Sequence, residues 1–302
     1  MLNASSHRSH SRRAFGSLLG LILIGNAWMV PCGFSSSVDM SDKQELRVIT
    51  YNLFLGRFWP EDAALAEKAR EQGQFAERLA LELSLYDPDI ITFSEAPDET
   101  VVADVARRLG MNHVSFSTPT YFPGALLTRF EIIDAQDIPL RDGERPSDLF
   151  TRHWGKATVR LPDDSRLIVH SAHLYPRASE ADVRMREVRA MHESIIEDIE
   201  AGRSVLLTGD LNHRPGAPEQ EYLFEGGWID TFAEAGVGTG MTARPDEPSR
   251  RIDYILAVGP IADRVVEARV LHEGSFRAHP ADPESFALSD HLPVFAVFDL
   301  TR

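Results

Sequence analysis

The segment SVLLTGDLN occupies residues 204–212, and its first five residues form a short apolar run of strand-forming side chains. Such a run, bounded by a glycine, predicts a buried β-strand. Two polar residues, Asp210 and Asn212, follow directly after Gly209, where packing does not require them. An ordinary turn after the glycine is the alternative interpretation of this pair. The segment therefore indicates a layered protein with functional groups at the ends of its strands.

Other strands of the chain carry polar residues of the same kind at their ends. They are Asn52 after the strand 46–51, Glu95 after 89–93, His173 after 168–172, Asp253 inside 251–255, and Asp290 with His291 before 293–299. Taken singly, each has an ordinary explanation as a turn residue, a helix cap or a satisfied buried histidine. Asp253 fits such an explanation least, because a carboxylate in an apolar strand costs several kcal/mol unless it is paired. Their recurrence favours one shared site.

The remaining pattern predicts an alternation of strands and helices. One helix is expected from Pro60 to the residue before Pro88, with an apolar face of Leu65, Phe75, Leu79 and Leu83. Further helices are expected near 98–109 and over 179–200, strands near 125–138, 155–161, 166–172, 204–208, 252–258, 265–271 and 293–299, and a loop over 240–250. No linker divides residues 41–302. We therefore expect one α+β domain in which two mixed sheets pack face to face with helices outside.

Three motifs carry a resemblance to a known superfamily: Gly209-Asp210-Leu211-Asn212, Arg251-Ile252-Asp253-Tyr254 and Ser289-Asp290-His291. Together with PSRRIDY over 248–254 and GALLTR over 124–129, they resemble bacterial members of the endonuclease/exonuclease/phosphatase superfamily. That superfamily includes deoxyribonuclease I, abasic-site endonucleases, neutral sphingomyelinases and inositol-polyphosphate phosphatases. The resemblance spans residues 46–299 and implies a four-layer αββα sandwich. Ser94 and Ala172 depart from the usual pattern, which has glutamine and a hydroxyl residue at these positions.

The resemblance implies a metal site and a phosphoester hydrolase that directs water in line at a phosphoryl group. By position, Glu95 is the main metal ligand, and Asn52 and Asp290 help directly or through water. Oxygen ligands of this kind suit Mg²⁺ or Mn²⁺. The expected cofactor is therefore one of these two ions.

The catalytic roles implied by the resemblance fall on five residues. Asp210 orients or deprotonates the attacking water, and Asn212 fixes its direction. His291, paired with Asp253, binds or protonates the phosphate. His173 holds a second phosphate oxygen or acts on the leaving group. At this level the general base is either Asp210 or the His291–Asp253 pair.

The net charge of the chain limits the classes of substrate that it can bind. The chain has a net charge of −15, of which residues 1–40 contribute +2, so residues 41–302 carry −17. An acidic surface repels phosphate backbones, which disfavours long nucleic acid as a partner. Lysine occurs only at positions 43, 68 and 156, so most positive charge is arginine, which suits bidentate phosphate contacts. Arg129 and Arg152 are the expected substrate contacts, with His213, for which an exposed loop histidine is the alternative.

Several substrate classes stay open, and a small soluble phosphoester fits an acidic exported protein best. A secreted nuclease would use an arginine face drawn from Arg57, Arg129, Arg152, Arg177, Arg184 and Arg214. A lipid phosphodiesterase of the sphingomyelinase type would use an aromatic loop, either Phe54, Phe58 and Trp59 or Tyr121 and Phe122. A non-catalytic binding module is the alternative of another class, and the presence of every expected acid and histidine favours an enzyme. We expect a monomer without an integral membrane body.

Residues 1–40 differ from the rest and predict an export leader. Basic residues at positions 8, 12 and 13 precede the apolar run 18–24, and small or polar residues follow. This layout is typical of a signal peptide, and the run is short for a membrane span. The stretch SRRAF over 11–15 resembles a twin-arginine signal, so both the general secretory and the twin-arginine routes stay open. Pro31 directly before Cys32, the only cysteine, disfavours lipidation at that cysteine. The leader as a whole predicts that the protein lies in the periplasm or outside the cell.

Overall fold

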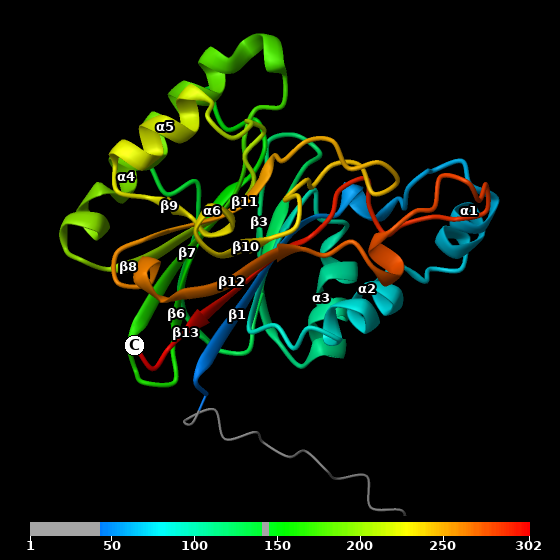
Figure 1. Cartoon of the computed structure of the whole chain (residues 1–302), viewed down its shortest axis with the longest axis horizontal. Helices are drawn as coiled ribbons and strands as arrows, with labels where there is room; N and C mark the ends of the chain where they lie inside the picture. The colour runs from blue at the N-terminus through cyan, green and yellow to red at the C-terminus, as the bar shows by residue number, and fades with distance from the viewer. Residues whose placement is uncertain (1–42, 141–144) are drawn as a thin grey trace, which may run out of the picture. The chain divides into compact units, whose positions relative to one another are not determined.

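Two β-sheets form the centre of the computed structural model, which describes residues 43–140 and 145–302 (Figure 1). One sheet has the strand order β10 (Gly236–Val237), β12 (Val265–Val270), β13 (Val294–Asp299), β1 (Glu45–Asn52), β2 (Ile90–Ser94), β4 (Gly124–Thr128), β3 (Asn112–Phe116). The other has the order β5 (Glu131–Asp137), β6 (Trp154–Arg160), β7 (Arg166–His173), β8 (Ser204–Asp210), β11 (Asp253–Val258), β9 (Ile229–Asp230). Both are mixed: β1 runs parallel to β2 and β7 parallel to β8, while most other pairs are antiparallel.

The alternation of side chains along each strand separates the layers. In β1, Val48 faces the apolar core between the two sheets, and Ile49 faces the helices on the outer side. In β8, Leu206 lies in the same central core, and Leu207 faces the opposite outer layer. Because side chains of a strand alternate between the two faces of its sheet, an apolar run buries both faces at once.

Helices cover the outer faces of both sheets (Figure 1). The first sheet is covered by α1 (Ala64–Glu71), α2 (Phe75–Ser84) and α3 (Glu99–Leu109), and the second by α4 (Ala181–Glu200) and α5 (Pro218–Glu225). The short α6 (Thr231–Ala235) contacts β11 and β12 at the edge. The four-layer αββα sandwich is therefore confirmed. In the described ranges, no helix combines the length and the apolar character that crossing a bilayer requires.

Some elements differ from the sequence-based expectation. The single helix expected from Pro60 is two helices, because Gly73 adopts a left-handed φ of +64° between α1 and α2. Leu65, expected on the buried face, is 45% exposed as a result of this break. The strand expected over 125–138 is two strands, β4 and β5, which belong to different sheets. β3, α5, α6, β9 and β10 were not expected, and the expected leader over 1–40 lies outside the described residues.

A chain of threonine hydroxyls crosses the interface between the sheets. The Thr92 hydroxyl lies 2.9 Å from the hydroxyl of Thr50 and 2.8 Å from the hydroxyl of Thr208 in the other sheet. Thr208 in turn donates to the main-chain carbonyl of His170 at 3.0 Å. All three hydroxyls are buried in an otherwise apolar interface, so their mutual bonds fix how the sheets are aligned. This alignment brings together the strand ends that carry the polar residues.

Candidate functional site

The predicted polar residues meet at one edge of the sandwich because the strands that carry them end there. Asn52 pairs in register with Ser94, so Glu95 follows one position beyond the end of β1. In the second sheet, Asp210 pairs in register with His173 on one side and with Asp253 on the other. Carboxyl ends of neighbouring parallel strands are a common place for functional sites in layered proteins.

His291 and Asp253 form a buried hydrogen-bonded pair. The Nδ1 atom of His291 lies 2.8 Å from Oδ2 of Asp253, and its Nε2 atom lies 3.8 Å from Oδ2 of Asp210. Burial alone would lower the pKa of His291, but the charges of Asp253, Asp210 and Asp290 outweigh it and raise that pKa to about 10. The imidazole is therefore protonated over the physiological range, with Nδ1–H bound to Asp253 and Nε2–H directed toward Asp210.

Asp210 is the residue on which the others converge. Its Oδ2 accepts a hydrogen bond from the Asn52 side chain at 3.1 Å, and its Oδ1 accepts from the main-chain N–H of Asn212 at 3.1 Å. The Nε2 atom of His173 lies 3.6 Å from the same Oδ2. Burial, followed by the charge of Asp253, raises the pKa of Asp210 to about 8. This carboxylate is poised to exchange a proton near neutral pH.

Gly209 permits the close approach of β8 to β7 next to this carboxylate. Its φ is +132°, and a Cβ atom at this position would lie 2.0 Å from the carbonyl oxygen of Ala172. Any other residue would push the strand ends apart and displace Asp210 from His173. The glycine of the GDLN motif is thus required by backbone packing.

Glu95, Asp290 and Asn52 form the oxygen-rich side of the site. Glu95 has a left-handed φ of +45°, which turns the chain sharply at the end of β2. The Ser289 hydroxyl donates to the main-chain carbonyl of Asn52 at 2.6 Å, and this bond ties the Ser289–His291 turn to β1. Burial raises the pKa of Glu95 and that of Asp290; the charge of Asp290 raises the pKa of Glu95 further, and the charge of Asp253 does the same for Asp290.

The donor set on this side fits a hard divalent cation. Among the residues that the structure describes, no Lys or Arg forms an ion pair with Glu95 or Asp290, so their charge calls for another counter-ion. The ligand atoms of Asp210, Asp253 and His291 also lie within 4.8 Å of one another. In that group, however, Nδ1 of His291 is already bonded to Asp253, and its Nε2 carries a proton. The Glu95 side, where carboxylate and amide oxygens predominate, is therefore the better fit for a cation.

Arg152 and His173 complete the site. The Arg152 guanidinium lies 4.5 Å from the ring centroid of Phe122, whose edge faces His173 at 6.3 Å. Burial lowers the pKa of Arg152, although the charges of Glu95 and Asp210 act in the other direction. Burial and the charge of Arg152 hold the pKa of His173 well below its usual value. The site thus pairs a permanent cation with a neutral histidine.

Glu187 supports both of these residues and was missed from the sequence. Its two carboxylate oxygens accept from the main-chain N–H of Phe150 at 2.7 Å and of Tyr175 at 2.9 Å. These two amides belong to the segments that carry Arg152 and His173. A signal was present, since Glu187 shares a helix face with Val183, Met191 and Ile195 at intervals of four residues. A carboxylate on an apolar face indicates a buried partner.

Two expected substrate contacts lie elsewhere. Arg129 forms an ion pair with Asp87 at 2.5 Å, at the start of β2 and therefore at the opposite edge of the sheet from Glu95. Because β4 runs antiparallel to β2, its C-terminal end, which Arg129 follows, lies beside the start of β2 and away from the site. His213 is 2% exposed and stacks on the ring of Tyr254 at 4.7 Å. Its buried position excludes the exposed loop histidine, and its ring packs on Tyr254.

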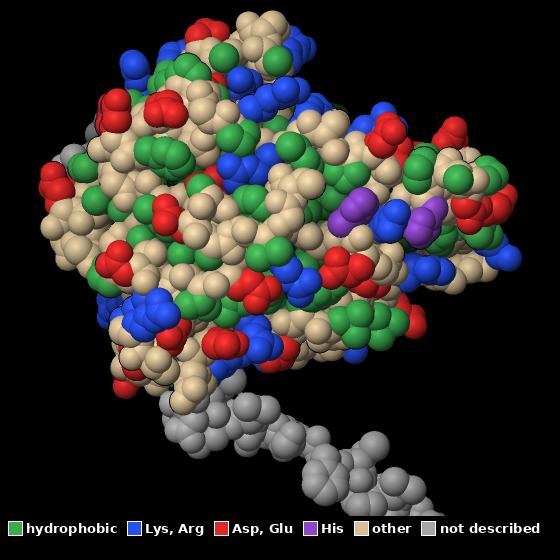
Figure 2. All heavy atoms as spheres, viewed as in Figure 1, with side chains coloured by type: hydrophobic (Ala, Val, Ile, Leu, Met, Phe, Trp, Pro, Cys, Tyr) green, Lys and Arg blue, Asp and Glu red, His purple; other side chains and the backbone are tan. Residues whose placement is uncertain are grey.

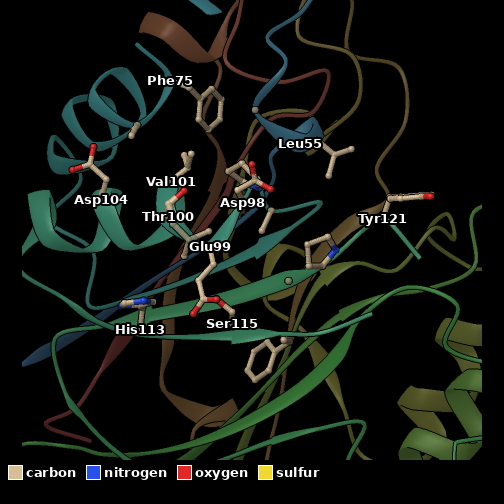
Figure 3. A pocket seen from close by; sticks show the side chains of 18 of the residues that line it. Leu55, Phe75, Asp98, Glu99, Thr100, Val101, Asp104, His113, Ser115 and Tyr121 are labelled. Atoms are coloured by element: carbon tan, nitrogen blue, oxygen red, sulfur yellow. The ribbon is translucent and has the colours of Figure 1, made fainter. Parts of the chain in front are cut away.

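A large cavity of about 1270 Å³ adjoins the oxygen-rich side. Its wall continues from the site itself, because Leu55 and Pro97 follow shortly after Asn52 and Glu95 in the chain. Figure 3 shows Leu55 and Tyr121 on one side of the cavity and Val101 from α3 on the other. The acidic residues Asp98, Glu99 and Asp104 also line it.

The sequence profile of the Endonuclease/Exonuclease/phosphatase family matches residues 49–291, which include every residue of the site described above. The chain belongs to this family. Membership in the Endonuclease/Exonuclease/phosphatase family indicates a phosphoester hydrolase, in agreement with the resemblance noted in the sequence.

Solved structures of the Endonuclease/Exonuclease/phosphatase family share the fold. A family protein from Bacteroides thetaiotaomicron has a TM-score of 0.65 and 20% identity, covering 85% of this chain and 99% of its own. A mannosyl-6-phosphatase from the same organism has a TM-score of 0.64 and 19% identity, and the match covers 83% of this chain and 98% of that protein. Truncated TDP2 from Caenorhabditis elegans has a TM-score of 0.60 and 17% identity, and the match covers 84% of this chain and 98% of that protein. No curated protein matches the chain significantly.

Proposed function

We propose that this protein is a metal-dependent phosphoester hydrolase that directs water in line at a phosphoryl group. The observation that carries the proposal is the convergence of Asp210, His291 and Asp253 with Glu95 at a single edge of the sandwich. These residues come from both sheets and span nearly 200 positions of the chain. Only a shared chemical task accounts for burying so many titratable groups together.

Glu95, Asn52 and Asp290 would hold a Mg²⁺ or Mn²⁺ ion, which supplies Lewis-acid stabilisation of a phosphoryl oxygen and of the leaving oxygen. The remaining chemistry belongs to side chains of the protein. Asp210 orients the attacking water and accepts its proton, with its own direction fixed by the Asn52 side chain and the Asn212 main chain. The high pKa of His291 favours Asp210 as the base, because a protonated imidazole has no lone pair to offer.

The cationic groups stabilise the charge that develops on the phosphoryl oxygens. Protonated His291, held by Asp253, donates from Nε2 to one oxygen in the transition state. Arg152 offers a second cationic donor. His173 is neutral and donates to a further oxygen or to the leaving group. Donors fixed by packing before the substrate arrives need little reorganisation during the reaction.

A small soluble phosphoester is the substrate class that we propose. The net charge of −15 disfavours long polyanions, and the acidic residues Asp98, Glu99 and Asp104 lining the adjoining cavity disfavour them further. One structural relative is named as a mannosyl-6-phosphatase, which supports this class. Of the aromatic residues considered for a lipid substrate, Phe58 is fully buried, and Phe122 packs beneath Arg152.

We further propose that the protein acts outside the cytoplasm. The support is the sequence of residues 1–40, with its basic start and short apolar run. Fusing this segment to alkaline phosphatase, which is active only after export, tests the proposal. Lack of alkaline phosphatase activity in a bacterial host would contradict it.

Hydrolysis of bis(p-nitrophenyl) phosphate and p-nitrophenyl phosphate by residues 41–302 tests the activity directly. We expect turnover with Mg²⁺ or Mn²⁺ that EDTA abolishes and fresh metal restores. Inactivity on these esters and on a panel of sugar phosphates, nucleotides and DNA would instead favour a non-catalytic binding module.

A further inference from the structure

A second pocket, of about 330 Å³, lies beside the catalytic residues on the side away from the large cavity. We call it the arginine pocket, and it is lined by Arg214, Pro215, Phe232, Thr239, Met241, Ser249, Arg250 and Arg251. Two segments that line the arginine pocket are directly connected along the chain to residues of the catalytic site. Arg214 follows Asn212 by two residues, and Arg251 precedes Asp253 by two.

Backbone pairing places the third segment of the arginine pocket against the catalytic histidine. Ala243 forms β-bridges with both Arg250 and His291. The Thr242 hydroxyl accepts from the main-chain N–H of Asp253 at 3.2 Å, and the Thr242 carbonyl accepts from Leu292 at 2.6 Å. The loop that carries Arg250 is therefore held on both sides of the Asp253–His291 pair.

The charge of the arginine pocket is opposite to that of the protein. Arg251 is neutralised by Asp230, whose Oδ2 lies 2.6 Å from its Nη1, and its guanidinium lies over the rings of Phe232 and Tyr254. Arg214 and Arg250 are exposed and have no ion-pair partner within the described part of the chain, and none of the lining residues is acidic. Figure 2 shows Lys and Arg side chains gathered at the upper middle of the visible face, near the end of β11.

We propose that the arginine pocket is a second anion-binding subsite, which takes a phosphate group of the substrate other than the one that is cleaved. Two free guanidinium groups with two hydroxyls, of Thr239 and Ser249, supply the donors that a phosphate dianion requires. The volume is at the lower end for a ligand site, which suits one phosphate with part of a carbon skeleton. The inference rests on the proposed function and narrows it to small esters with a second anionic group.

Binding of inorganic phosphate in the presence of EDTA tests the arginine pocket without any turnover. EDTA removes any divalent ion from the catalytic site, but Arg152 and protonated His291 remain there, so the affinity lost in the variants, and not the total affinity, reports the arginine pocket. We expect the double variant Arg214→Gln/Arg250→Gln to bind phosphate about 100-fold more weakly, about tenfold for each charged hydrogen-bond donor removed. The matched control, Arg166→Gln/Arg264→Gln, removes two arginines from the opposite edge and keeps the wild-type affinity. Equal affinities in the two variants, or no binding to the wild type, would overturn the inference.

A kinetic comparison separates this inference from the proposed function. The probes are fructose 1,6-bisphosphate and fructose 6-phosphate, with Mg²⁺ present. We expect a lower KM for the bisphosphate in the wild type and the loss of this preference in Arg214→Gln/Arg250→Gln. Hydrolysis without any preference, together with absent phosphate binding, contradicts the arginine pocket alone. Phosphate binding without hydrolysis of any ester contradicts the proposed function and leaves the subsite supported. A variant that loses affinity for single-stranded DNA and keeps its phosphate affinity would show a nucleic-acid surface instead.

Discussion

His291 and Asp253 lie 38 positions apart in the chain, yet their side chains are joined by a 2.8 Å contact between Nδ1 and Oδ2. Each residue accounts for the charge that the other carries in a buried position. Asp253 would be an unpaired buried carboxylate without the imidazole, and the imidazole would be neutral at this depth without the carboxylate. The pair therefore places a fixed cation next to Asp210, with Nε2 of His291 3.8 Å from Oδ2 of that residue.

Replacing the imidazole tests this role. We expect His291→Asn to lower kcat for bis(p-nitrophenyl) phosphate by about 10²–10⁴-fold, because a general acid or charge-stabilising donor contributes on that order. Circular dichroism should show an unchanged fold. The control His279→Asn alters an exposed histidine of the preceding loop and retains full activity. A His291→Asn enzyme within threefold of the wild-type rate would refute the assignment.

The alkaline limb of the pH profile depends on Asp253. Its charge is the chief factor that raises the pKa of His291 to about 10 against the opposing effect of burial. In Asp253→Asn the imidazole loses this stabilisation and deprotonates at lower pH, so the fall of kcat/KM at high pH should move toward neutrality. Steady-state rates between pH 5 and 11 measure the shift. An alkaline limb at the same pH in both enzymes contradicts the pairing.

Glu187 is expected to act on substrate binding through the segments that it holds. Glu187→Gln leaves one of the two amides, of Phe150 or Tyr175, without an acceptor, at a cost of about 1–3 kcal/mol in stability. Because Phe150 and Tyr175 each lie two residues from a proposed substrate contact, Arg152 and His173, KM should rise several-fold more than kcat falls. Glu193→Gln, on the exposed face of the same helix, serves as the control. A loss of stability with unchanged KM would leave Glu187 with a structural role alone.

Cation binding should stabilise the folded chain. The raised pKa of Asp210, about 8 against about 3.8 in an unfolded chain, means that the metal-free protein loses stability as pH rises from about 4 to 8, and the loss is complete above pH 8. A divalent ion at 100 times its Kd adds about 2.7 kcal/mol. Thermal unfolding with and without Mg²⁺ measures both effects. We expect Glu95→Gln to abolish most of the metal-induced rise in Tm, and an undiminished rise would place the ion elsewhere.

Acid should destabilise the protein through two histidines beneath the site. Burial lowers the pKa of His153 and that of His170 to about 3, against about 6.5 in an unfolded chain. Their contribution to stability is therefore complete above pH 6.5 and is lost as pH falls toward 3. Guanidinium unfolding at pH 7 and pH 4.5 should show a smaller pH dependence for His153→Gln than for the wild type. An equal dependence would mean that His153 is not buried as a neutral ring.

The main architecture and most of the site could be predicted from the sequence because they depend on local patterns. Alternating and apolar runs specify strands, and the polar residues that end them meet wherever the strands lie side by side. Asn52, Glu95, Asp210 and His291 were located in this way. The functional roles given to these residues remain predictions.

What could not be predicted depends on pairings distant in sequence. Arg129 follows a motif typical of the superfamily, but the antiparallel direction of β4 takes it to the far edge. The break at Gly73 was hidden because the apolar periodicity continues on both sides of it. Glu187 could be noticed as a carboxylate on an apolar helix face, but its partners are main-chain amides, which the sequence does not identify.

The threonine chain through Thr50, Thr92 and Thr208 joins two halves of the molecule that each hold only part of the chemistry. A fragment ending at residue 140 would hold Asn52 and Glu95, and a fragment starting at residue 145 would hold Asp210, Asp253 and His291, so neither fragment has a complete set of reactive groups. Catalysis would then appear only after the fragments reassociate, which makes turnover a direct reporter of reassembly. Loss of the Thr92 hydroxyl in a valine variant should weaken that reassembly while leaving every reactive group in place.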